Sequence, residues 1–451
     1  MRSENAKKTS GLQQVSGGRV SRSMAIASVQ GPSAGTAVPS IYKGALATVT
    51  TLFFMWGFVT VLNDILVPHL KSIFDLNYAG VMLIQFAFFS AYFIFSIPSA
   101  KVIDWIGYKK TMVVGLFTMG LGALLFIPAA SVPSYPLFLG ALMVLAAGIT
   151  ALQVAANPYV AVLGPPQTAS SRLNLAQAFN SVGTTIAPYL GGLIILSVAS
   201  KNMDAVRHMS PEALQAYRVH EASSVEAPYL IIGLVLVALA IGIAMFKLPA
   251  MPEAERHGQP IPGTSIWKHR HLVLGAVAIF LYVGAEVSIG SFLVNYFSQP
   301  EIGNVSTVVA SRFVSFYWGG AMVGRFIGSA ILQKVRTRIV LGIAAIAACL
   351  LVSVSMFTSG HIAMGSIILV GLFNSVMFPN IFTLGIEGLG PLTGDGSGLL
   401  VTAIVGGAII PVVQGALADH VGIQHAFILP AICYLYIMFY AFRGSKPELP
   451  A

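Results

Sequence analysis

The chain has 451 residues, of which 56% are hydrophobic and only 9% are charged, and its formal net charge is +9. Soluble domains carry about 25% charged residues, so this composition excludes an ordinary soluble protein. The basic residues stand mostly in short loops between apolar segments, where they indicate membrane topology rather than a nucleic-acid surface. The two cysteines lie inside apolar segments, which excludes a disulfide framework, and no motif of a metal site is present.

The first 44 residues differ in composition from the rest of the chain. They are rich in Ser, Gly and Gln, and they lack the continuous apolar stretch of a signal peptide. Such a segment buries too little apolar surface to fold. We therefore expect residues 1–44 to form a disordered cytoplasmic tail.

Twelve apolar segments follow, each long enough for a spanning helix, which needs ~20 residues. We expect spans at 45–70, 79–103, 109–130, 134–163, 172–199, 226–248, 271–298, 306–333, 337–358, 361–387, 394–420 and 423–442. An even number of spans places both termini on one side of the membrane. The loops on that side include Lys101, Lys109 and Arg338 among many basic residues, whereas the other side has Lys71, Lys201, Arg207 and Arg218. The positive-inside rule then predicts cytoplasmic termini in a multi-pass protein of the cell (inner) membrane.

A polar, proline-rich cytoplasmic linker at 249–270 divides the spans into two halves, 45–248 and 271–442, and 443–451 forms a second cytoplasmic tail. The halves are weakly similar. Gly57 precedes Asp64 by seven residues in the first span, and Gly284 precedes Ser291 by seven in the seventh. We therefore predict an all-α membrane protein with two parallel six-helix repeats, an arrangement in which the substrate binds between the repeats near the middle of the membrane.

Two carboxylates, Asp64 and Glu286, lie inside apolar spans. A charge at that depth is costly and is typical of an ion path, a ligand site or a partner charge. No cation neighbours Asp64 within its span, and apolar surroundings favour the neutral carboxyl group, so we expect Asp64 to bind and release protons. Glu286 is a second proton site, a sugar ligand or the partner of a cation. Arg325 is the nearest candidate for that cation, unless it snorkels to the cytoplasmic face.

Polar side chains in the first half form stripes on helical faces. Trp56, Thr60, Asn63 and Asp64 share one face, which offers an aromatic plane, a hydroxyl, an amide and an acid, the groups that hold a sugar. In the fourth and fifth spans the candidates are Gln153, Asn157, Asn174, Gln177, Asn180 and Ser181. Each amide either contacts substrate or joins neighbouring helices.

In the second half, Tyr282 and Glu286 share one face of the seventh span, and Asn295 lies on another. Asn374, Asn380 and Gln414 are further polar candidates. The density of amides and hydroxyls in these spans favours a sugar cavity over the apolar cavity of a drug exporter. A membrane-embedded enzyme is disfavoured because no His lies centrally in a span, and a sugar receptor because no signalling domain is present.

The strings FFMWGFVTVLNDILVPHLK, ANPYVAVLGP, SRLNLAQAFNSVG, YVGAEVSIGSFLVNYF and FPNIFTLGIEGLG resemble the fucose–galactose–glucose proton symporters of the major facilitator superfamily. The similarity runs from about residue 53 to the end of the twelfth span and is nearer to the bacterial glucose/galactose branch. It implies a monomeric monosaccharide importer without a cofactor other than its coupling cation. Glucose or galactose is the substrate that it implies, with fucose or N-acetylglucosamine as alternatives.

The resemblance also assigns roles to residues. It implies proton coupling for Asp64 and sugar binding for Asn180. The chain departs from the family twice: Gln153 stands where the family has a second acid, and Glu286 stands where the fucose permease has a neutral amide. Coupling therefore uses Asp64 alone, Asp64 with Glu286, or Na⁺ in place of H⁺.

The loop AKVIDWIGYKK between the second and third spans resembles a signature of the superfamily. Asp104, Gly107 and Lys109 match it, and the family uses this region in conformational switching. Its counterpart GSAILQKVRTR after the eighth span keeps only Gly328 and basic residues. We place Arg325, a few residues earlier, in the same switching group.

Overall fold

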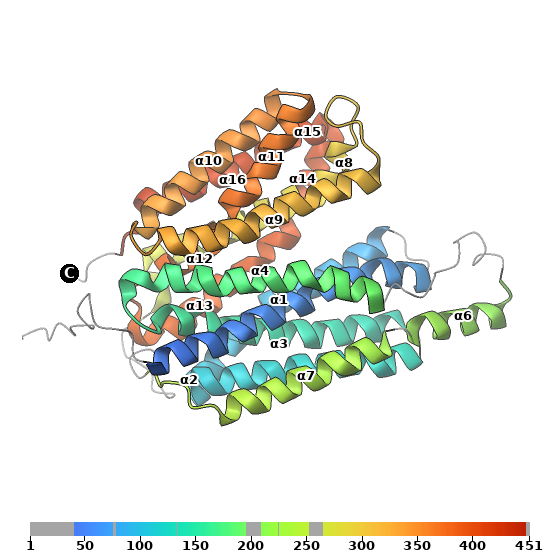
Figure 1. Cartoon of the computed structure of the whole chain (residues 1–451), viewed down its shortest axis with the longest axis horizontal. Coiled ribbons are helices and arrows are strands. Elements are labelled where there is room, and N and C mark those ends of the chain that lie inside the picture. The colour runs from blue at the N-terminus through green and yellow to red at the C-terminus, as the bar shows by residue number, and fades with distance from the viewer. Residues whose placement is uncertain are drawn as a thin grey trace, which may run out of the picture. The chain divides into compact units, whose positions relative to one another are not determined.

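The computed structural model describes residues 40–74, 78–132, 134–194, 209–223, 225–251 and 265–447, and its regular elements in these ranges are all helical. The first half contains α1 (Ser40–Phe74), α2 (Tyr78–Ser131), α3 (Tyr135–Val162), α4 (Ala169–Ile194), α6 (Pro211–Ser223) and α7 (Glu226–Met245). The second half contains α8 (Arg270–Phe297), α9 (Thr307–Ile331), α10 (Thr337–Phe357), α11 (Gly360–Asn374), α12 (Met377–Gly385), α13 (Thr393–Thr402), α14 (Gly406–Val421), α15 (Ile423–Ala426) and α16 (Ile428–Phe439) (Figure 1). The predicted tail up to residue 39 and the linker residues 252–264 lie outside these ranges.

The described helices account for the twelve predicted spans. Nine stretches of the described residues are long and apolar enough to cross a membrane, and one of them, Leu83–Ser131, has 49 residues and contains two spans. The break between those two spans is at Gly107, whose φ of 79° and ψ of 169° are not helical. The other two spans are α4 and α9, which are more polar. The tenth span combines α11 with α12, and the eleventh combines α13 with α14.

Within each half, the helices pack mainly on one another. In the first half α2 packs on α3 and α7, and α1 packs on α4; in the second half α8 packs on α14 and α16, and α10 packs on α11 and α16. The halves meet where α4 packs on α9 and where α13 packs on α2 and α3. Figure 1 shows α4 and α9 running side by side.

Glycines at equivalent places show the internal repeat in three dimensions. A Cβ atom on Gly57 of α1 would overlap the backbone carbonyl oxygen of Asn180 on α4. A Cβ on Gly284 of α8 would overlap the side chain of Ile410 on α14. Small residues let membrane helices approach closely, so the two glycines that the sequence paired both lie at close crossings between the first and a later helix of their half.

Candidate functional site

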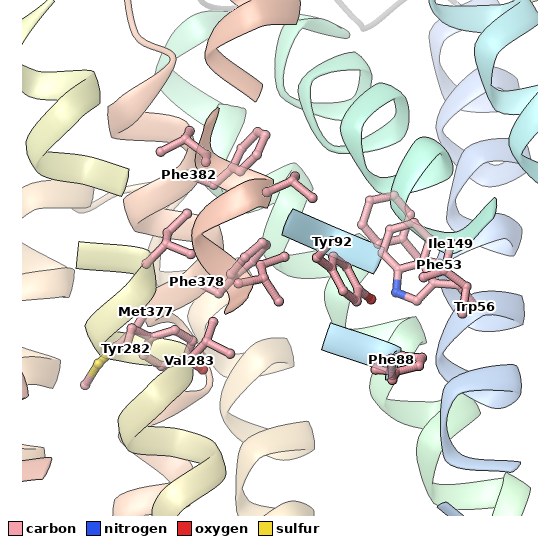
Figure 2. Close-up of a cluster of buried hydrophobic side chains, with 14 of the residues drawn as sticks. Phe53, Trp56, Phe88, Tyr92, Ile149, Tyr282, Val283, Met377, Phe378 and Phe382 are labelled. Atoms are coloured by element: carbon pink, nitrogen blue, oxygen red, sulfur yellow. The ribbon is translucent and has the colours of Figure 1, made fainter. Parts of the chain in front are cut away.

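The aromatic and amide groups predicted in the first half lie together in the structure. Trp56 is 4% exposed, and the centroid of its ring is 4.0 Å from that of the Phe53 ring. On the neighbouring helices, Gln153 Nε2 of α3 donates a 2.9 Å hydrogen bond to the hydroxyl of Tyr92 on α2. Figure 2 shows Tyr92 with Phe53 and Trp56 on one side of the buried cluster, and Tyr282 with Phe378 and Phe382 on the other. Residues of both halves therefore face one another here.

Asn157 of α3 is a fully buried amide of the first half. It has no exposed surface, and neither its side-chain nitrogen nor its oxygen has a hydrogen-bond partner among the described residues. Buried polar atoms are nearly always bonded in proteins. Asn157 therefore has the capacity to bind a water or a substrate hydroxyl.

The polar stripe on α4 is divided between two roles. Asn180 Nδ2 donates to the carbonyl oxygen of Phe53 at 2.8 Å, which joins α4 to α1. Asn174 Nδ2 donates to Oδ1 of Asn380 on α12 at 3.0 Å, which joins the two halves. Gln177 is also buried, and its backbone carbonyl accepts a hydrogen bond from the second half. In this conformation Asn180 and Asn380 thus join neighbouring helices, which is the alternative to a contact with substrate.

Two of the predicted residues, Asn63 and Asp64, belong to α1, but their side chains lie outside the described part of the structure. Their proposed roles stay predictions.

A second polar cluster surrounds Glu286 on α8. The hydroxyl of Tyr282 donates to the carbonyl oxygen of Asn374 at 3.0 Å, and Asn374 Nδ2 donates to the hydroxyl of Tyr317 at 2.9 Å. The Tyr317 hydroxyl in turn lies 3.4 Å from the carbonyl oxygen of Glu286. Oε1 of Glu286 is buried without a hydrogen-bond partner among the described residues. The cluster can therefore accept a hydroxyl donor or a proton at Glu286.

Two members of this cluster, Tyr317 of α9 and Tyr434 of α16, escaped the sequence analysis. Tyr434 lies beside Asn374 and interacts electrostatically with Tyr317 and Glu286. A tyrosine in an apolar helix resembles any other core aromatic residue in sequence, although a buried hydroxyl needs a partner. Asn295, in contrast, is exposed and does not join the cluster.

Several hydrogen bonds between the halves lie at the end of the helices where α7 ends and α8 begins, which we call the linker end. Ser170 of α4 lies 2.8 Å from the Thr337 hydroxyl and 2.6 Å from that of Thr383. Ser171 and Ser329 exchange two bonds: each hydroxyl donates to the other residue's carbonyl oxygen, at 2.7 and 3.0 Å. These pairs and Asn174–Asn380 form what we call the linker-end contact.

The loop signature lies at the same end. Lys101 forms ion pairs with Asp395 of α13 at 2.9 Å and with Asp104 at 3.6 Å, so it connects the signature to the second half. Gly107 has a positive φ, which suits glycine. Lys109 Nζ donates to the carbonyl oxygen of Ala244 at the end of α7. The structure thus brings all three signature residues close to a junction between helices.

Arg325 of α9 is half-buried and bonds to groups of both halves, which disfavours the alternative that it snorkels to the cytoplasmic face. Its Nη1 donates to the carbonyl oxygen of Gln177 at 3.2 Å and to the hydroxyl of Ser181, both on α4. Its Nε donates to the carbonyl oxygen of Ser375 at 3.4 Å. The close packing of α9 against α4 turns the guanidinium inward, so that Arg325 bridges the halves.

Known proteins resemble this chain over most of its length. Residues 45–404 match the family described as the Major Facilitator Superfamily. A protein named glucose/galactose transporter from Brucella abortus biovar 1 (strain 9-941) is 53% identical over 405 residues, which cover 90% of this chain and 95% of that protein. The L-fucose-proton symporter of Escherichia coli (strain K12) is 37% identical over 408 residues, covering 88% and 93% of the two chains.

The solved structures agree with this relationship. A crystal structure of the fucose:proton symporter FucP from E. coli matches with a TM-score of 0.83 at 36% sequence identity, covering 89% of this chain and 98% of that one. The family match, the sequence relatives and the helical architecture together show that this chain is a multi-pass membrane protein that belongs to the major facilitator superfamily.

Proposed function

We propose that the protein imports a hexose of the glucose/galactose type together with a cation, by alternating access between its two halves. The observation that carries this proposal is the placement of buried amides and phenols on both sides of the boundary between halves, with the linker-end contact closing one end. Alternating access requires a central site and a contact that forms at only one end at a time. The 53% identical relative named glucose/galactose transporter supports the choice of substrate.

The sugar would bind between Gln153, Asn157 and Trp56 in the first half and the Glu286 cluster in the second. Amides and phenols present donors and acceptors in the mixture that sugar hydroxyls need. Fucose is the second candidate substrate, because the E. coli relative is named an L-fucose-proton symporter.

The proposed coupling cation is H⁺, with Na⁺ as the alternative. Asp64 is the expected proton site, and Glu286 is a second acid at depth on the other half. Because Gln153 cannot titrate, a pair of carboxylates within the first half is not available, and sharing between the halves becomes the natural arrangement.

The orientation follows from charge. The linker end carries Lys101, Lys109 and Arg338, so the positive-inside rule places that end, and both termini, in the cytoplasm. A contact that closes the cytoplasmic end would make this the outward-facing state. A FucP structure in the outward conformation matches with a TM-score of 0.83, which supports that assignment. We expect the protein to act as a monomer.

Uptake of labelled glucose and galactose into proteoliposomes tests the proposal. A proton gradient and a sodium gradient are imposed separately. Accumulation driven by protons supports H⁺ coupling through the carboxylates. Accumulation driven only by sodium makes them ion ligands instead, and no accumulation of either sugar under either gradient refutes the proposed substrate.

A further inference from the structure

The hydrogen bonds of Arg325 in the described part of the structure go to neutral acceptors. Its three hydrogen bonds go to Gln177 and Ser181 of the first half and to Ser375 of the second. A guanidinium inside a membrane segment is costly unless a countercharge compensates it. The neutral acceptors orient Arg325 but leave its charge to be balanced elsewhere.

Glu286 is an acid close enough to Arg325 to act as that countercharge. Its carboxyl group interacts electrostatically with Arg325, across the contact between α8 and α9. No direct ion pair joins Glu286 and Arg325 in the described part of the structure. The two charges therefore act on each other over a longer distance. Tyr282, Tyr317 and Tyr434 are the titratable groups that face Glu286 from α8, α9 and α16. In the part of the chain that the structure describes, these neighbours of Glu286 are uncharged phenols, and Arg325 is a nearby cation.

We propose that Arg325 is a positioning residue that makes the separation of α4 from α9 depend on the charge of Glu286. The inference rests on the proposed function only in treating this separation as the opening step of transport. When the helices part, Arg325 loses Gln177 and Ser181. An ionised Glu286 on its own half can then take over as a partner. A neutral Glu286 cannot, so separation costs more and the linker end stays closed.

This arrangement would prevent leakage of the coupling cation. A carrier with a neutral Glu286 and no sugar would stay closed at the linker end, because nothing replaces the acceptors that Arg325 would lose. Bound sugar would have to supply the missing free energy. Arg325 thus makes the contact between α9 and α4 depend on the charge of Glu286.

The test measures how often the linker-end contact opens. Ser171 is buried within that contact, so a thiol introduced by Ser171→Cys reacts with a maleimide only when the halves separate there. The background carries Cys349→Ala and Cys433→Ala, and the purified protein is labelled in detergent. The labelling rate is compared between this parent, Glu286→Gln, Arg325→Gln and the double variant.

We expect Glu286→Gln to label about tenfold more slowly than the parent and Arg325→Gln about tenfold faster, the size expected for one charge-assisted hydrogen bond. In the double variant, Glu286→Gln should add nothing to Arg325→Gln. Arg325→Lys keeps the charge and should keep the response to Glu286→Gln, which provides a second test if Arg325→Gln folds poorly. Arg312→Gln, at an exposed arginine of the same helix, is the matched control and should label like the parent.

Two outcomes would overturn the inference. One is an unchanged labelling rate in Glu286→Gln, and the other is an equal slowing by Glu286→Gln when Arg325 is already Gln. Labelling needs neither sugar nor an ion gradient, so a failure of the proposed hexose transport would leave this result interpretable.

Discussion

Asn174 of α4 and Asn380 of α12 are 206 positions apart in the chain and share a 3.0 Å hydrogen bond between their side-chain amides. Both side chains are fully buried. The bond crosses the boundary between the halves at the linker end, next to the Ser170 and Ser171 contacts. It must break each time that end opens, so it contributes to the stability of the closed state and to the barrier for leaving it.

Asn174→Ala should weaken the linker-end contact. The substitution removes the donor and leaves Oδ1 of Asn380 buried and unpaired, at a cost of about 1–3 kcal/mol. We expect faster hydrogen–deuterium exchange in the first turns of α4 and in α12, measured by mass spectrometry. Thr118→Val, which removes a hydroxyl that bonds only within α2, is the control. Equal exchange in the two variants would show that the amide pair does not hold the halves together.

Gln153→Ala should weaken sugar binding more than it changes the dependence on the coupling ion. Gln153 is held by the Tyr92 hydroxyl, so Tyr92→Phe should act in the same direction through misplacement of the amide. Loss of one neutral hydrogen bond predicts an increase in KM of about three- to tenfold. Sugar counterflow at varied concentration measures this. An unchanged KM in both variants would restrict Gln153 to joining α2 and α3.

Asp64→Asn should abolish concentrative uptake while some sugar exchange continues. Asn cannot bind and release a proton, yet its size and its hydrogen-bonding groups resemble those of Asp. Accumulation under the driving gradient and counterflow without a gradient are measured on the same proteoliposomes. Full accumulation by this variant would remove Asp64 from coupling, and complete loss of counterflow would assign it to sugar binding as well.

The apolar runs predicted the helices well because a membrane span must satisfy every backbone hydrogen bond within itself. The break at Gly107 was also predicted, since a short charged loop separates two spans there. The pairing of Gly57 with Gly284 anticipated equivalent helix crossings in the two halves. These features depend on residues that are close in sequence, or on a repeat that the sequence itself contains.

The contacts between the halves were not predictable from periodicity. Asn174 and Asn380 each read as a candidate sugar ligand or helix contact, and only the fold places one against the other. Arg325 was expected to pair with Glu286 or to snorkel, whereas its hydrogen bonds go to neutral groups on α4 and at Ser375, just after α11. Tyr317 and Tyr434 were missed because nothing in the sequence shows that the fold places their hydroxyls beside Glu286 and Asn374.

Two glycine substitutions should differ in their effect on stability. At Gly57 an added methyl group would overlap the backbone of Asn180 where α1 crosses α4. Backbone cannot rotate away as a side chain can, so Gly57→Ala should destabilise the protein by about 1–3 kcal/mol. Gly140 of α3 has open space around its Cβ position, and Ala there should be neutral or stabilise by up to about 1 kcal/mol through reduced backbone entropy. Thermal unfolding of the two purified variants in the same detergent, followed by a thiol-reactive dye, gives the comparison. A Tm for Gly57→Ala equal to or above that of Gly140→Ala would mean that α1 and α4 can separate without loss, and that this crossing does not fix the geometry of the first half.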